Sequence, residues 1–270
     1  TAGISKKELA AIAVTRGPGL MGSLLVGVSF AKAFAKSLDI PLIDVNHMQA
    51  HVLAHFISEP RPKFPFICLT VSGGHTQLVL VKDHLTMEVI GETQDDAVGE
   101  AFDKTAKLLG LPYPGGPLLD RHAKEGNPKA FTFPVTRMPG LNYSFSGIKT
   151  AVLYFLRDRL AENPNFIAEN LADLCASIQY TLVEMLLIKL KVAMKEYGIT
   201  EVAIAGGVSA NSGLRTTLSA LSLRKGWTLY VPEFEYCTDN AGMIAMAAHY
   251  KYLRGEFVGY DIAPLAKMKF

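Results

Sequence analysis

Two histidines, His47 and His51, lie four residues apart where an apolar pattern predicts the start of a helix. Side chains at positions i and i+4 share one helix face, so both imidazoles can offer a nitrogen to a single point. Such a pair is typical of metal binding, but a tightly held divalent metal usually takes three or more protein ligands. Among the distant carboxylates, Asp239 is the best placed third ligand, although its position before a helix also fits an ordinary N-cap.

Two other interpretations of the histidine pair have to be weighed. His55 lies one turn further along, so a plain polar stripe of three histidines between core and solvent is the alternative interpretation. A zinc protease of the H-E-x-x-H type is disfavoured, because its general base must directly follow the first histidine. Here Met48 and Gln49 stand in that region. The pair can bind a metal, but the stretch lacks the base for peptide hydrolysis.

Glycine-rich turns predict a place for a phosphate and a nucleoside. Gly73 and Gly74 separate strands predicted at 66–71 and 77–81, and the amides of such a turn can cradle an anion. A plain hairpin fits equally well. After a buried strand at 201–205, the small residues of 206–211 would let a flat ring lie against the backbone, with Asn211 able to pair with base or ribose edges. Neither the usual P-loop nor the dinucleotide glycine motif occurs.

Three carboxylates, Asp96, Glu100 and Asp103, are predicted to share a face of a helix over 97–109. Like charges stacked in this way repel, so a metal, hydroxyl groups or cations facing them would explain the arrangement. Lys104 and Lys107 offer a second explanation, because they can compensate the charge within the same helix.

A basic stretch interleaved with aromatic residues runs from Arg121 to Arg157. Six lysines and arginines face a single acid there, Glu125. Basic and aromatic side chains together suit a single-stranded RNA loop, whose phosphates and splayed bases they can contact. The aromatic residues can also be core, and that alternative remains open. They are Phe131, Phe133, Tyr143, Phe145 and Tyr154.

The remaining pattern alternates strands and helices. An apolar run at 11–14, a glycine turn, a helix over 20–38 and a strand at 41–45 predict a β-α-β unit with parallel strands. Further helices are predicted at 118–124, 149–160, 167–196 and 241–250, a helix from the turn at 206–211 through Leu223, and a strand at 227–231. The fold class is therefore α/β.

Composition bounds the function only loosely. The chain has 270 residues, 49% hydrophobic and 19% charged, enough for one large domain or two smaller ones. With a net charge of +2, a nucleic-acid partner would have to be held by a local patch. No apolar run reaches the roughly 20 residues of a membrane span. Three widely spaced cysteines fit neither a disulfide framework nor a C-x-x-C site, which predicts a cytoplasmic protein.

Seven ordered motifs resemble those of the TsaD/Kae1 family, from near Ile4 to near Tyr250. They are Asn46–His51, Val71–Thr76, Gly99–Lys104, Tyr113–Pro117, Phe145–Thr150, Ala205–Asn211 and Cys237–Asn240. The members are tRNA threonylcarbamoyladenosine transferases, once labelled O-sialoglycoprotein endopeptidases, and the chain resembles the bacterial branch. The resemblance implies an actin-like ATPase fold (ASKHA, RNase H-like) with two lobes. We expect residues 1–44 plus 242–270 to form the N-terminal lobe and 45–241 the C-terminal lobe. Because members normally carry an additional N-terminal segment, we expect the first lobe to be incomplete.

The resemblance also implies a site. His47, His51 and Asp239 match the family's ligands for one iron or zinc. The residues that match its positions for ATP, AMP or threonylcarbamoyl-adenylate are Thr70, Val71, Ser72, Gly73, Gly74, Asp103, Gly116, Asp120 and Asn211.

The implied reaction moves the threonylcarbamoyl group from the adenylate to the exocyclic amine of adenosine 37, in tRNAs that read codons beginning with A. AMP leaves, and no general base is assigned. The implied partners are tRNA, a TsaB-type paralogue and a TsaE-type ATPase. Two alternatives stay open: a catalytically silent scaffold subunit of the same fold, which would not need the metal triad, and an ASKHA-type small-molecule kinase, which would not need the histidine pair.

Overall fold

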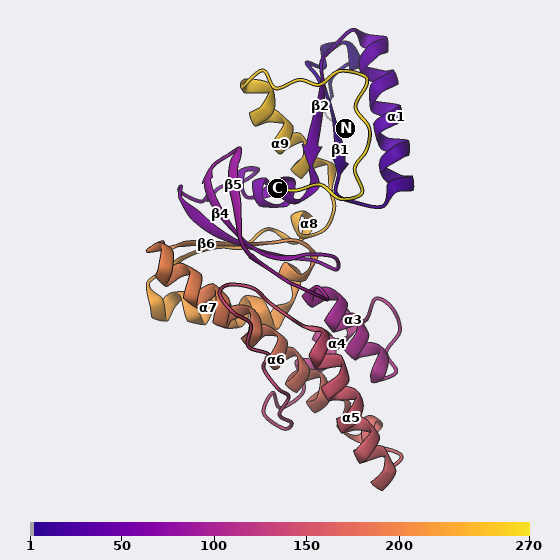
Figure 1. The fold of residues 1–270 in the computed structure, drawn as a ribbon, viewed down its shortest axis with the longest axis vertical. Coiled ribbons are helices and arrows are strands. Elements are labelled where there is room, and N and C mark those ends of the chain that lie inside the picture. Colours follow the sequence, from indigo (N-terminus) through magenta and orange to yellow (C-terminus); the bar gives the residue numbers. More distant parts are fainter. Residues whose placement is uncertain (1–2) are drawn as a thin grey trace.

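The computed structural model describes residues 3–270 and arranges the chain around two β-sheets (Figure 1). A two-stranded parallel sheet pairs β1 with β2, and a five-stranded sheet has the order β5-β4-β3-β6-β7. The strands are β1 (Ile12–Gly17), β2 (Leu42–Asn46), β3 (Phe66–Val71), β4 (Thr76–Asp83), β5 (Thr86–Glu92), β6 (Glu201–Ala205) and β7 (Thr228–Tyr230).

The helices lie on both sides of these sheets. The α-helices are α1 (Met21–Leu38), α2 (His47–Leu53), α3 (Val98–Leu108), α4 (Gly115–Ala123), α5 (Ser146–Glu162), α6 (Phe166–Tyr197), α7 (Ser212–Lys225), α8 (Phe234–Cys237) and α9 (Ala241–Leu253). Three short 3-10 helices are η1 (Lys6–Glu8), η2 (Ala54–Phe56) and η3 (Gly207–Ala210). The predicted helix starts at 118 and 149 were too late, because α4 and α5 begin three residues earlier.

The small sheet confirms the predicted β-α-β unit: β1 and β2 are parallel and α1 connects them. In Figure 1, α1 and α9 lie on opposite sides of the two strands, and both helices contact them. The C-terminal helix α9 therefore completes a unit that begins near the N-terminus. The division of the chain into lobes at residues 44 and 241 stays a prediction.

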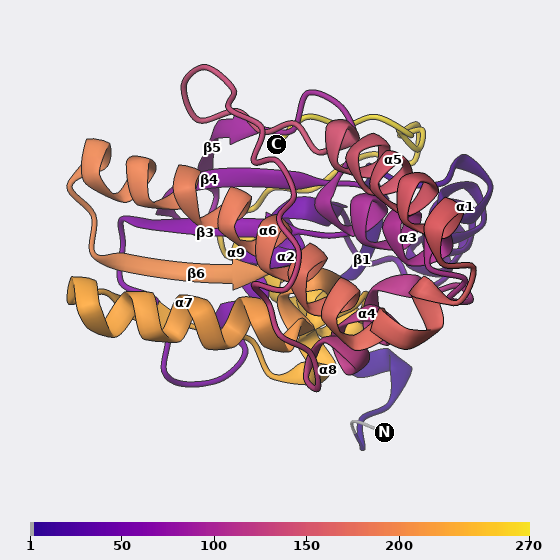
Figure 2. The same cartoon turned by 90° about the horizontal axis from the view of Figure 1, so that it is seen from below.

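The large sheet has two buried faces, as the two-residue period of strands requires. On one face, Ile67 and Leu69 of β3 pack with α3–α7, and Figure 2 shows α6 and α7 running across this face. On the other face, Phe66 and Cys68 pack with α2 and α9. The predicted antiparallel hairpin at Gly73-Gly74 is confirmed. Strand β5 was missed, because only one of its seven residues is buried and its apolar signal is weak.

Among the residues that the structure describes, two helices are long and apolar enough by composition to cross a membrane, α1 and α6. In α6, 67% of the most apolar window is buried inside the protein, so its apolar residues build the core. In α1 only 22% is buried, and its outer face is apolar and exposed.

Candidate functional site

The first part of the site is a cluster of two imidazoles and a carboxylate. Asn46 ends β2 and N-caps α2, its Oδ1 accepting hydrogen bonds from the N–H groups of Met48 (2.9 Å) and Gln49 (3.2 Å). His47 is therefore the first helical residue and His51 lies one turn later, with ring centroids 4.8 Å apart. Asp239 Oδ1 lies 3.2 Å from His47 Nε2 and 3.3 Å from His51 Nε2. Residues from both ends of the sequence thus meet at one point.

Asp239 does not cap the helix that follows it. The N-cap of α9 is Asn240, whose Oδ1 accepts a hydrogen bond from Met243 N (2.8 Å). The N-cap interpretation of Asp239 was wrong, and its carboxylate is free to face the imidazoles. Hydrogen bonds from His47 and His51 hold the pKa of Asp239 well below its usual value. The Asp239 side chain is 78% exposed and that of His51 only 3%, so the cluster is open on one side.

His55 is separate from this cluster. Its Nε2–H donates to the carbonyl of Ile204 (2.8 Å), and burial lowers the pKa of the ring to about 4. A neutral, buried histidine that anchors η2 to β6 does not belong to an exposed polar stripe. The stripe interpretation was wrong, and His55 is structural.

The donor set of the cluster fits a divalent transition metal. Imidazole nitrogen and carboxylate oxygen are common ligands of zinc and iron(II), and three protein ligands with an open side are typical of sites that act on a substrate. The candidate ligand atoms of His47, His51 and Asp239 all lie within 4.8 Å of one another.

Arg215 holds the segment that leads to Asp239. Its Nη2–H donates to Pro232 O (2.8 Å) and Cys237 Sγ (3.1 Å), and its Nε–H donates to Ser209 O (2.7 Å). One guanidinium therefore ties η3 to the turn that carries the third carboxylate.

The second part of the site is a cavity of about 270 Å³ between α3, α4 and η3. Five of the predicted nucleotide residues line it: Gly73, Asp103, Gly116, Asp120 and Asn211. Four do not line it, namely Thr70, Val71, Ser72 and Gly74. Thr70 and Val71 are buried in β3, and Ser72 closes the turn by accepting hydrogen bonds from Gly74 N (3.3 Å) and His75 N (3.0 Å).

Two glycines allow the walls of this cavity to approach β3. Gly206 has a φ of +87°, and a Cβ there would lie 2.5 Å from Val71 O. A Cβ at Gly99 would lie 2.5 Å from Ser72 O. Gly206 needs glycine for its positive φ and for the missing Cβ, whereas Gly99 needs it only for the missing Cβ.

Asp103 holds the start of α4. Its Oδ1 accepts hydrogen bonds from Gly115 N and Gly116 N, both at 2.9 Å. The other two acids, Asp96 just before the helix and Glu100 within it, are compensated by Lys104, whose Nζ lies 2.7 Å from Asp96 and 2.9 Å from Glu100. The lysine explanation of the acidic face is confirmed for Lys104, and Asp103 is the acid that lines the cavity.

Asp120 and Asn211 are both engaged at the start of α7. Asp120 Oδ1 accepts from Ser212 Oγ (2.7 Å) and Ser212 N (3.2 Å). Asn211 Oδ1 accepts from Leu214 N (2.9 Å), and its Nδ2 donates to Gln179 Oε1 (2.7 Å). One donor and one lone pair of the Asn211 amide are thus engaged inside the protein, and its pairing with a base or ribose stays a prediction.

Some lining residues were not singled out from the sequence, namely Gly99, Phe102, Pro114 and Pro117. All four belong to motifs already quoted, so the motifs were the signal that could have found them. His75 was also passed over as a site residue. Burial lowers the pKa of His75, and the charges of His47 and His51 lower it further.

The basic stretch separates into core and surface. Phe133, Tyr143 and Phe145 are buried, so the core interpretation is right for them. Tyr154 is 52% exposed, and the guanidinium of Arg157 lies 5.0 Å from its ring centroid. An exposed aromatic under a cation is a suitable surface for a nucleotide base.

The chain matches the family model TsaD, described as tRNA N6-adenosine threonylcarbamoyltransferase, over residues 1–246. Proteins of that name are similar to it over nearly its whole length. The protein of Cytophaga hutchinsonii is 62% identical, and the match covers 99% of this chain and 78% of the relative. The protein of Christiangramia forsetii is 60% identical, with 100% of this chain and 80% of the relative covered. The protein of Porphyromonas gingivalis is 56% identical, with 99% of this chain and 80% of the relative covered.

Solved structures show the fold. Full-length HypF in its phosphate- and nucleotide-bound form superposes with a TM-score of 0.66 at 14% identity, over 90% of this chain and 39% of HypF. Component A of the Acidaminococcus fermentans (R)-2-hydroxyglutaryl-CoA dehydratase gives a TM-score of 0.51 at 15% identity, over 94% of this chain and 80% of its own. The predicted actin-like ATPase fold is confirmed.

Relatives of this identity and coverage distinguish the open alternatives. They are transferases that modify tRNA, which excludes the kinase and the silent scaffold as the best description. The chain belongs to the TsaD family of tRNA N6-adenosine threonylcarbamoyltransferases, and it acts in the threonylcarbamoyladenosine modification of tRNA.

Proposed function

We propose that this chain transfers the threonylcarbamoyl group from threonylcarbamoyl-adenylate to the exocyclic amine of adenosine 37 and releases AMP. Its substrates would be tRNAs that read codons beginning with A. One observation carries the proposal: the turn Ser72–His75 joins the two parts of the site. Gly73 lines the nucleotide cavity, and two residues later His75 lines another cavity together with Met48, the residue after His47. An adenylate in the cavity can therefore extend its acyl end toward the cluster.

We assign one iron or zinc to His47, His51 and Asp239. When bound, such a metal would supply Lewis-acid polarisation of the threonylcarbamoyl carbonyl or carboxylate. The chain's own residues do the positioning. Gly73, which lines the cavity, faces the phosphate, the backbone of η3 supports the adenine ring, and Asp103 accepts hydrogen bonds from ribose or threonyl hydroxyls. Amine attack on a mixed anhydride needs this positioning more than it needs a strong base.

We place part of the tRNA face on the basic stretch, at the exposed Lys129 and Arg137. Reversing both charges to glutamate should weaken tRNA binding about tenfold. It should also make the slope of log K against log salt shallower by about two, because a complex with two fewer phosphate contacts releases fewer counterions when it forms. Filter binding at several salt concentrations measures both quantities.

The matched control for this test reverses two exposed lysines of α6, Lys191 and Lys195, and so makes the same change in net charge. We expect the control to retain most of its affinity. Equal losses in both double variants would show that only the overall charge matters, and the assignment of the tRNA face would be abandoned.

We infer that a TsaB-type paralogue docks on α1 and that a TsaE-type ATPase joins the assembly. The outer face of α1 presents an exposed apolar strip of Leu25, Val26 (71% exposed) and Phe30 (69% exposed). Val26→Asp should weaken the complex at least about tenfold, since burying a carboxylate without a partner is costly. Gel filtration with the purified paralogue, with and without the ATPase, measures complex formation.

The control is Leu253→Asp at the end of α9, where a similarly exposed leucine lies outside the strip. An unchanged elution profile for Val26→Asp would remove α1 from the interface. Because tRNA is the substrate, we place the assembly in the cytoplasm.

A further inference from the structure

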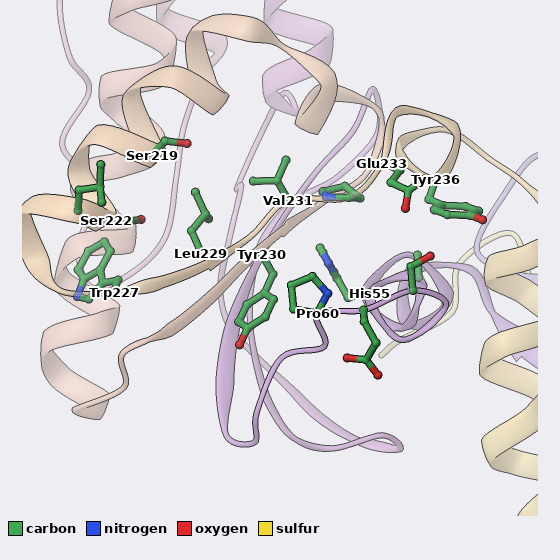
Figure 3. Close-up of a pocket in the computed structure, with 15 residues that line it drawn as sticks. His55, Pro60, Ser219, Ser222, Trp227, Leu229, Tyr230, Val231, Glu233 and Tyr236 are labelled. Carbon is green, nitrogen blue, oxygen red and sulfur yellow. The ribbon is translucent and has the colours of Figure 1, made fainter.

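A second large cavity, of about 610 Å³, lies at the free edge of the five-stranded sheet (Figure 3). It shares no lining residue with the nucleotide cavity, and none of the three metal ligands contributes to it. Its walls come from η2 and the following loop, from the end of α7, and from β7 with the segment after it. Its lining includes Glu59, Leu223, Trp227, Leu229, Val231 and Glu233.

The floor of this cavity is an unpaired strand edge. Thr228 N donates to Thr200 O (2.9 Å), so the peptide groups of Thr228 face β6. Backbone groups alternate in direction along a strand, so those of Leu229 in β7 face away from β6, and Val231 follows directly after the strand. Within residues 3–270, no strand pairs with this outer edge, and no turn or loop hydrogen bond uses the backbone of Leu229 or Val231.

The sides of the cavity are apolar and lie on both faces of β7. Figure 3 shows Leu229 and Val231 on the side of Ser219 and Ser222 of α7, with Tyr230 on the opposite side near Pro60. Leu223 at the end of α7 lines the cavity and is 84% exposed, so its apolar side chain is accessible to a ligand. An added strand would therefore find alternating apolar contacts above and below its backbone.

The charges of the lining are of one sign. Glu59 and Glu233 are acidic, and no lysine or arginine is among the described residues that line the cavity. Glu59 is paired with Arg61 (3.2 Å), whereas Glu233 has no ion pair within the part of the chain that the structure describes. His55, which also lines the cavity, is committed to Ile204 and does not offset the negative charge.

We propose that this cavity is a docking groove for an extended peptide segment of a partner protein, which pairs with the free edge of β7 and carries apolar residues at alternate positions and a lysine or arginine beside Glu233. Two backbone residues with free N–H and C=O groups supply the hydrogen bonds that align the segment. The apolar walls select the side chains, as in other cases of strand addition to a sheet edge.

Trp227 makes the groove directly observable, because it is the only tryptophan of the chain and it lines the cavity. The experiment titrates the intact protein with seven-residue capped peptides that contain no tryptophan. In these peptides threonine alternates with valine, leucine or phenylalanine. Each peptide carries one lysine, placed at its N-terminal end in one series and at its C-terminal end in the other. We expect at least one peptide to change the tryptophan emission saturably, with a dissociation constant below 1 mM, the ~4 kcal/mol range of a weak peptide site.

Two controls test the two parts of the proposal. Methylating alternate backbone nitrogens of the best peptide should weaken binding about tenfold, because it removes the strand hydrogen bonds and keeps the side chains. Glu233→Lys should weaken the lysine peptide about threefold, and a glutamate peptide should restore the affinity to that variant. Leu253→Glu, at an exposed leucine elsewhere, should change nothing.

Either of two results would overturn the proposal. If no peptide of the panel saturates below 1 mM, the edge is not a peptide site. If the methylated peptide binds as well as its parent, the cavity accepts apolar side chains without strand pairing, and a small apolar ligand becomes the better description.

Discussion

Replacing Asp239 with alanine is expected to remove the metal and to lower threonylcarbamoyl transfer by at least about a hundredfold. The variant keeps His47 and His51 but loses the carboxylate that contacts both, and two imidazoles alone hold a divalent metal weakly. Elemental analysis of the purified protein should find about one iron or zinc per chain in the parent and almost none in the variant. His47→Ala should behave in the same way, because it breaks the set from the other end of the sequence.

The neighbouring residue supplies the control. Asn240→Ala removes the N-cap of α9 and should cost about 1 kcal/mol of stability, but it leaves all three metal ligands in place. Metal loss in Asp239→Ala with metal retention in Asn240→Ala would assign the effect to the ligand and not to the helix. Full metal occupancy in Asp239→Ala would contradict the proposed site.

Asp103→Asn is expected to weaken binding of the adenylate or AMP by about tenfold or more while leaving metal content unchanged. One carboxylate oxygen, Oδ1, is engaged by Gly115 N and Gly116 N, so Oδ2 is left for a hydroxyl in the cavity. Asparagine can keep the first two hydrogen bonds through its carbonyl oxygen. It replaces the charged acceptor by an N–H donor, and hydrogen bonds to charged groups contribute about 1.5–3 kcal/mol. Calorimetric titration with AMP measures the loss.

Asp103→Ala separates the two roles of this carboxylate. It also removes the acceptor that holds the start of α4, so we expect a lower melting temperature in addition to weaker nucleotide binding. An Asp103→Asn protein with unchanged AMP affinity, metal content and transfer rate would leave Asp103 with a structural role only.

Local patterns in the sequence were sufficient for most elements. The strands around Val14 and Leu69, the helices around Val28 and Leu182, and the hairpin at Gly73 all follow from periodicity and turn chemistry, which act over a few residues. The i, i+4 spacing likewise places His47 and His51 on one helix face. The ordered motifs supplied the family and the fold.

The site needed more than these patterns. Five of the nine predicted nucleotide residues meet around one cavity, but Thr70 and Val71 belong to the core of β3, and the amide of Asn211 is bound to Leu214 and Gln179. A motif marks a segment in which a ligand is bound. It does not distinguish the side chains that face the ligand from those that hold the segment in place.

The sequence by itself thus determined the fold class, the family and the histidine pair, because each depends on residues close together in the chain or on motifs in a fixed order. Only the tertiary structure decided that Asp239 and not Asn240 faces the imidazoles, that His55 is buried against β6, that Lys104 neutralises Asp96 and Glu100, and that β7 ends the sheet with a free edge. These outcomes depend on which segments pack together across large separations in the chain. Side chains of the same type then differ in burial and in hydrogen-bond partners, and those two quantities set their chemistry.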